Sequence, residues 1–219
     1  MLRILTGLAL MAALAACAEN RDHLSAHYLD QYAEPDPRPV QFRECHGFSC
    51  AFPSRVSLRP ADWRRVHAEF TPPTKDAATE RRRIAAAVAL MQRLVGAQTG
   101  TSVHQWTHKD MMILPNLGDP TQLDCIDEAV NTWTYMTMME RDGLFRFHHV
   151  APLAFAGSPL DPNPRNAAVL QERGGTYYVL DPSLVDSGVA PPVLPLADWL
   201  ESWPPDLARY DGAGLPSRK

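Results

Sequence analysis

Apolar residues follow helical spacing in the first two thirds of the chain and strand spacing after residue 143. Helical spacing is clearest in three segments, residues 60–70, 79–95 and 119–143. After that point, apolar and polar positions alternate, as in strands with one buried face. Helices followed by paired strands predict an α+β fold.

The alternating part predicts an antiparallel sheet on which the last of these helices packs. Its strands are expected near residues 144–156, 166–172 and 176–181. A Gly174-Gly175 turn joins the last two as a hairpin. In the first strand the alternation places His149 on the core side and His148 on the solvent side. A short helix containing Trp199 is expected to pack on the outside.

The first 16 residues form a signal peptide rather than part of the fold. Arg3 precedes an apolar run from Ile4 to Leu14, which is too short for a permanent membrane span. The run ends in Leu14-Ala15-Ala16-Cys17, which resembles a bacterial lipobox. This resemblance implies cleavage before Cys17, a lipid on its thiol and a periplasm-facing outer-membrane lipoprotein. An ordinary signal peptide is the alternative.

The rest of the chain divides into a linker over residues 17–39 and one domain over residues 40–219. The linker is polar and carries the proline-spaced stretch EPDPRP. The net charge of −4 and the lack of a long basic block give no reason to expect nucleic acid as a partner. No phosphate-binding loop is present, and we expect no cofactor.

Cys45 and Cys50 are predicted disulfide partners around a tight turn at Gly47. Export to an oxidising compartment favours this bond. Zinc with His46 as a third ligand is the alternative, although three ligands within six residues are difficult to arrange tetrahedrally. A metal bound by His104 and His108 is a weaker alternative. We predict no metal site.

Cys125 stands near the front of the helix predicted over residues 119–143. The positive end of a helix dipole lowers the pKa of a thiol and favours the nucleophilic thiolate. Asp124, Asp127 and Glu128 stabilise the dipole and work against that effect. A small buried cysteine at a helix–sheet contact is the alternative.

The order of three motifs resembles the transglutaminase-like branch of the papain-type cysteine enzymes. Asp124-Cys125 begins a helix, Ala168-Val169-Leu170 lies on a strand, and Val179-Leu180-Asp181-Pro182 ends the next strand. The resemblance implies a papain/transglutaminase-like core, with Cys125 as nucleophile and Asp181 as the carboxylate that orients a histidine. CHGFSC, LDCIDEA and MMERDGL are similar to motifs of a set of uncharacterised proteobacterial proteins with this core.

One part of the family pattern is missing. Arg165 and Asn166 stand where the family has its histidine, and neither side chain can accept the thiol proton. His149 replaces it only if the fold brings that side chain beside Cys125. We expect Cys125 and Asp181 to face one cleft, with Arg165 or Asn166 between them.

Two functions follow from this pattern. The first is an envelope lipoprotein whose degenerate transglutaminase-like domain binds or scaffolds a peptide or an envelope protein. The alternative is an active thiol hydrolase or acyltransferase that uses Cys125 on peptide or amide bonds. The missing base favours the first function.

Overall fold

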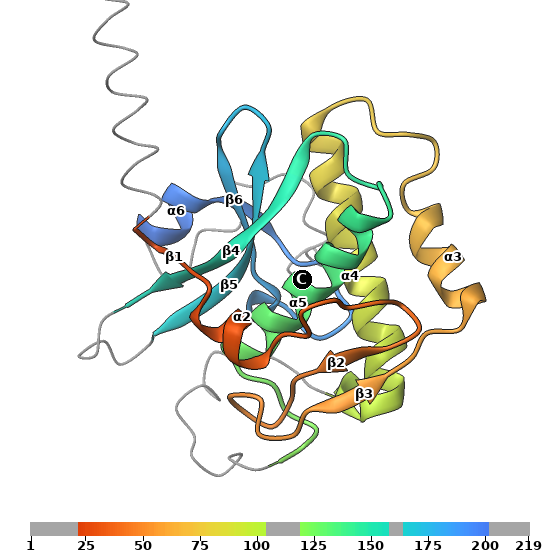
Figure 1. Ribbon diagram of the computed structural model, residues 1–219. Coiled ribbons are helices and arrows are strands. Elements are labelled where there is room, and N and C mark those ends of the chain that lie inside the picture. The colour runs from red at the N-terminus through yellow and green to blue at the C-terminus, as the bar shows by residue number, and fades with distance from the viewer. Residues whose placement is uncertain (1–21, 104–118, 158–163, 202–219) are drawn as a thin grey trace, which may run out of the picture.

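The computed structural model describes residues 22–103, 119–157 and 164–201 and has an α+β fold (Figure 1). The described helices are α2 (His27–Tyr32), α3 (Pro60–Ala68), α4 (Ala77–Thr99), α5 (Cys125–Arg141) and α6 (Leu196–Glu201). The described strands are β1 (Leu24–Ser25), β2 (Phe42–Glu44), β3 (Ser54–Val56), β4 (His148–Ala156), β5 (Arg165–Glu172), β6 (Tyr177–Leu180) and β7 (Val193–Pro195).

The main sheet is antiparallel, with strand order β1-β4-β5-β6-β7, and β2 and β3 form a separate two-stranded sheet. Both faces of the main sheet are covered. Alternate β5 residues Ala168 and Leu170 join the core beneath α4 and α5, while Ala167 and Val169 join a second core around α6. Figure 1 shows α6 on the opposite side of the sheet from α4 and α5. The predicted pairing of 166–172 with 176–181 is confirmed.

Helix α4 follows its predicted amphipathic pattern. Ile84, Val88, Met91 and Val95 are all fully buried. Asp76 caps the first turn by accepting the N–H of Thr79 at 2.6 Å. The local sequence therefore determines both the start of the helix and its buried face.

Helix α5 begins at Cys125, several residues later than the predicted start near Asp119. The carboxylate of Asp124 accepts the N–H groups of Ile126 at 3.0 Å and Asp127 at 2.8 Å. Asp127 in turn accepts the Asp124 N–H at 3.2 Å, which completes a capping box. Asp119 instead stabilises a separate turn through Thr121. Cys125 is consequently the first residue of the helix.

The predicted orientation of His148 and His149 is wrong. His148 is fully buried and His149 is exposed, because the strand begins at His148 rather than at residue 144. Glu80 of α4 accepts the backbone N–H of His148 at 3.1 Å and lies 2.9 Å from its Nδ1 atom. A register shift between Ala151 and Ala154 then changes the phase of the remaining strand.

The segment before residue 40 is partly folded onto the domain, which differs from the expected linker over residues 17–39. Strand β1 pairs with β4, with Leu24 opposite Ala154. Tyr28 and Leu29 of α2 pack against the main core. The signal peptide and Cys17 lie outside the described residues. Within the described residues, no helix is long and apolar enough to cross a membrane.

The predicted disulfide is confirmed, with the sulfurs of Cys45 and Cys50 2.03 Å apart. Gly47, Phe48, Ser49 and Cys50 all have positive φ angles. The carboxylate of Asp127 accepts the N–H groups of Phe48 at 2.9 Å and Cys50 at 2.6 Å. The disulfide loop is therefore held directly on the first turn of α5.

Candidate thiol site at the start of helix α5

Cys125 is a half-buried residue at the point where α5 meets the beginning of β5. Its Sγ atom lies 3.7 Å from Asn166 Nδ2 and 3.8 Å from the carbonyl oxygen of Pro164. The amide of Asn166 donates to the sulfur. Asn166, one of the two residues expected at the family-histidine position, therefore lies beside the thiol.

Arg165 lies on the other face of the sheet, because consecutive strand residues point in opposite directions. Its guanidinium carbon is 4.9 Å from the centre of the Trp199 ring. Its Nη2 atom donates to the Trp199 carbonyl at 3.2 Å. Of the two residues at the family-histidine position, only Asn166 contacts Cys125.

Asp181 directly follows β6 and is almost fully buried, but its carboxylate contacts no histidine among the residues that the structure describes. One oxygen accepts the N–H of Ser183 at 3.1 Å and its hydroxyl at 2.5 Å. The other accepts the Trp199 indole N–H at 2.8 Å. Trp199 is fully buried, because α6 turns this side chain towards the sheet. Asp181 thus stabilises the end of β6 and the position of α6.

The pKa of the Cys125 thiol is raised to about 12, the direction opposite to the one that the helix dipole alone favours. Burial is the largest cause of the rise, and the negative charge of Asp124 adds to it. Hydrogen bonding with Asn166 lowers the pKa, and the charge of Asp181 raises it by a smaller amount. The effect of Asp181 indicates that it lies near the thiol. The carboxylates that cap the helix offset its positive end.

Two further side chains, not identified from the sequence as site residues, belong to this environment. Glu128, one turn beyond Cys125, is buried, and burial together with Asp181 raises its pKa well above the usual range. The pKa of Tyr28 from α2 is raised by burial and by Cys125, which places its phenol near the thiol. Helical spacing from Cys125 indicates Glu128, whereas no local signal indicates Tyr28.

His149 does not lie beside Cys125. Its Nδ1 atom is 2.7 Å from Oε1 of Glu140. Glu140 is about four turns beyond Cys125 on α5, roughly 22 Å along the helix axis. His46 contacts the Pro120 carbonyl at 2.7 Å and the Ser54 hydroxyl at 2.8 Å.

No cluster of three metal-ligating side chains occurs within residues 22–103, 119–157 and 164–201. His104 and His108 lie outside the described residues, so the structure does not test a metal site at these two histidines. Comparisons of the chain with protein-family models, with curated proteins and with solved structures find no match. The geometry of the chain's own residues is therefore the basis for interpreting the site.

Proposed function

We propose that this domain has a papain/transglutaminase-like core that has lost thiol chemistry and acts in binding or scaffolding. The observation that carries the proposal is Asn166, whose amide is 3.7 Å from the Cys125 sulfur. A cysteine on a helix, a polar residue on an adjacent strand and an aspartate ending the next strand follow the family order. The residue that would move the proton has changed.

The chemistry that this arrangement can support is limited at the proton-transfer step. A thiol nucleophile must give its proton to a base, and the leaving group must later receive one. The amide of Asn166 has no basic atom for either transfer. Because burial raises the pKa of Cys125 to about 12, the thiol form predominates at neutral pH.

The sequence supports a place for this binding role in the cell envelope. The lipobox-like sequence at Cys17 suggests a lipid anchor in the outer membrane, facing the periplasm. We infer that the partner is a peptide or an envelope protein, because the family that this chain resembles acts on peptide or amide bonds. Residues around the site, such as Asp181, would then stabilise the fold of the domain rather than take part in turnover.

A pair of histidine variants tests the loss of chemistry. Asn166→His places an imidazole beside Cys125, whereas Arg165→His places one on the opposite face of the sheet and is the matched control. We would measure iodoacetamide labelling of Cys125 against pH, and turnover of thioester and amide substrates. Circular dichroism would establish that each variant is folded.

We expect slow labelling of the native thiol at neutral pH and no turnover that depends on Cys125. Asn166→His should accelerate labelling near neutral pH, while Arg165→His should not. General acid–base assistance is worth roughly 10²–10⁴ in rate, so a restored imidazole should give measurable turnover if the remaining geometry suffices. Robust native turnover that disappears in Cys125→Ala would instead establish the thiol hydrolase or acyltransferase alternative.

A further inference from the structure

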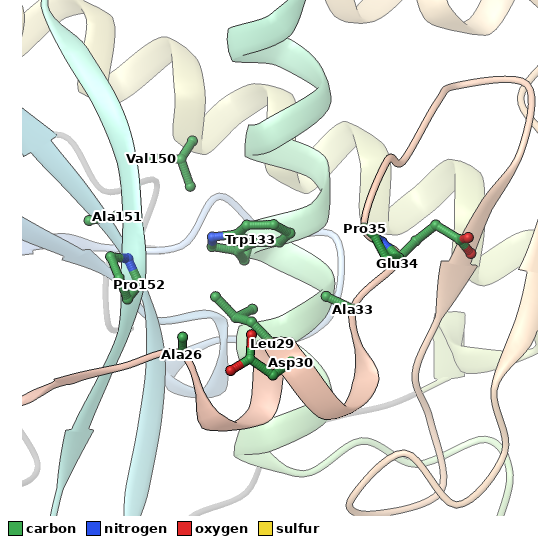
Figure 2. A pocket seen from close by; sticks show the side chains of 10 residues that line it. All are labelled: Ala26, Leu29, Asp30, Ala33, Glu34, Pro35, Trp133, Val150, Ala151 and Pro152. Carbon is green, nitrogen blue, oxygen red and sulfur yellow. The ribbon is translucent and has the colours of Figure 1, made fainter.

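A groove of about 450 Å³ runs along α2, between this helix and β4 (Figure 2). We call it the α2 groove. Ala26, Leu29, Asp30 and Ala33 line its first wall, and their spacing of three and four residues identifies one face of the helix. The volume lies in the range typical of ligand sites. A helix of this length extends roughly 9 Å, which matches about three residues of an extended peptide.

The middle of the α2 groove is apolar and aromatic. Trp133 of α5 lies between α2 and β4, facing Leu29 on one side and Val150 and Pro152 on the other (Figure 2). Across the described residues, its indole N–H makes no hydrogen bond. The groove thus offers a ring face for an apolar or cationic group and one donor for a carbonyl oxygen.

The charge around the α2 groove is negative. Asp30 lies on the α2 wall below Trp133, and Glu34 stands at the far end, past the helix (Figure 2). Neither carboxylate forms an ion pair within the described part of the chain. Arg141 donates to the carbonyl of Pro35, which lines the groove, and its guanidinium is paired with Asp36. An occupant with a positive charge therefore complements this surface.

The edge of β4 beside the groove is not available for the addition of another strand. Val150 N–H donates to Oε2 of Glu140 at 3.0 Å, and Pro152 has no N–H to offer. Recognition must therefore rest on side chains and on the indole donor, rather than on a ladder of backbone hydrogen bonds.

We propose that the α2 groove binds an extended peptide of about three residues in which an arginine or lysine lies beside an apolar side chain. The apolar side chain packs on Trp133, the positive group pairs with Asp30, and a peptide carbonyl accepts the indole N–H. This surface is separate from the Cys125 thiol, and its occupation does not depend on the loss of chemistry there.

The test follows the Trp133 indole N–H signal of the full chain by ¹⁵N nuclear magnetic resonance, with Trp133→Phe used to assign it. The probes are N-acetylated, C-amidated Leu-Arg-Leu and the same peptide with glutamine in place of arginine. We expect a saturable shift with the arginine peptide and a weaker response to the glutamine peptide. Asp30→Asn should raise the Kd by about fivefold, in line with one solvent-accessible ion pair.

Asp186→Asn is the matched control, because it removes the same charge from an exposed residue that does not line the groove. Its Kd should equal that of the native chain. The proposal is overturned if the arginine peptide produces no saturable shift, or if the two peptides bind equally. Binding of n-butylguanidinium as tight as that of the arginine peptide would also overturn it, by showing a small-cation site. None of these outcomes changes the labelling of Cys125, so the two proposals fail independently.

Discussion

Replacement of Glu80 should reveal how strongly α4 holds the start of β4. This carboxylate is fully buried and accepts the backbone N–H groups of Arg146 at 2.8 Å, Phe147 at 2.9 Å and His148 at 3.1 Å. It also accepts the Thr74 hydroxyl at 2.9 Å and lies 2.9 Å from Nδ1 of His148. Because Arg81 can only donate to Nε2 of His148, the Nδ1 proton is the one directed at Glu80.

Glu80→Ala leaves these buried donors without their acceptor. An unsatisfied buried donor costs about 1–3 kcal/mol, and water entry and relaxation make the sum less than additive. We therefore expect the free energy of unfolding to fall by about 3–5 kcal/mol, as when one partner of a buried charged pair is removed. Urea denaturation followed by circular dichroism measures this loss.

The pH dependence provides an independent measurement of the same contacts. Burial alone would raise the pKa of Glu80, but hydrogen bonds from His148, the Arg146 and Phe147 backbone and Thr74 outweigh it and lower the pKa to about 2. The unfolded chain takes up this proton near pH 4.3. The contribution of Glu80 is therefore fully present above that pH and is lost as the pH falls towards 2. The difference corresponds to about 3 kcal/mol.

Glu80→Gln is the matched variant, because it keeps the shape and removes the titration. It should be less stable than the native chain at neutral pH, yet lose less stability between pH 5 and 2. An acid limb as steep in Glu80→Gln as in the native chain would refute the role given to Glu80. A loss of less than about 1 kcal/mol in Glu80→Ala would refute it as well.

Three further predictions concern other parts of the domain. Burial raises the pKa of Glu44 to about 8, against a hydrogen bond from the Tyr135 hydroxyl at 2.7 Å, and the charge of Asp127 adds to the rise. The folded state thus keeps a proton that the unfolded chain releases near pH 4.3, so stability falls as the pH rises between these values. Glu44→Gln should reduce this fall in the free energy of unfolding, measured by urea denaturation across the same pH range. An unchanged fall would contradict the raised pKa of Glu44. Asn131 bonds both the N–H of Cys45 at 2.8 Å and its carbonyl at 2.7 Å, so Asn131→Ala should lower the free energy of unfolding by about 3 kcal/mol. Urea midpoints measure this, and a loss below about 1 kcal/mol would argue against the clamp. Mass spectrometry of membrane-extracted protein should find Cys17 as a lipidated N-terminus, and an unmodified Cys17 would exclude the anchor.

The features predicted correctly from the sequence are those whose signals lie close together in the chain. The buried stripe of α4 follows from residues three and four apart, and Gly143 ends α5 with a positive φ angle as its position after the helix indicated. Cys45 and Cys50 are only five residues apart, so the expectation of export to an oxidising compartment was enough to predict their disulfide. The hairpin of β5 and β6 follows from a local turn and alternating side chains.

The candidate site depended instead on contacts between residues far apart in the chain. Adjacent residues on β5 separate Asn166 from Arg165, and only the packing of α5 on one face determines which of them meets Cys125. The orientation of His148 depends on Glu80, and the partner of Asp181 is Trp199. The sequence alone determined the main helices, the β5–β6 hairpin and which chemical groups are present, because those signals are local. The tertiary structure decided which of those groups meet, because burial, charge and hydrogen bonding at a site are set by elements distant in sequence.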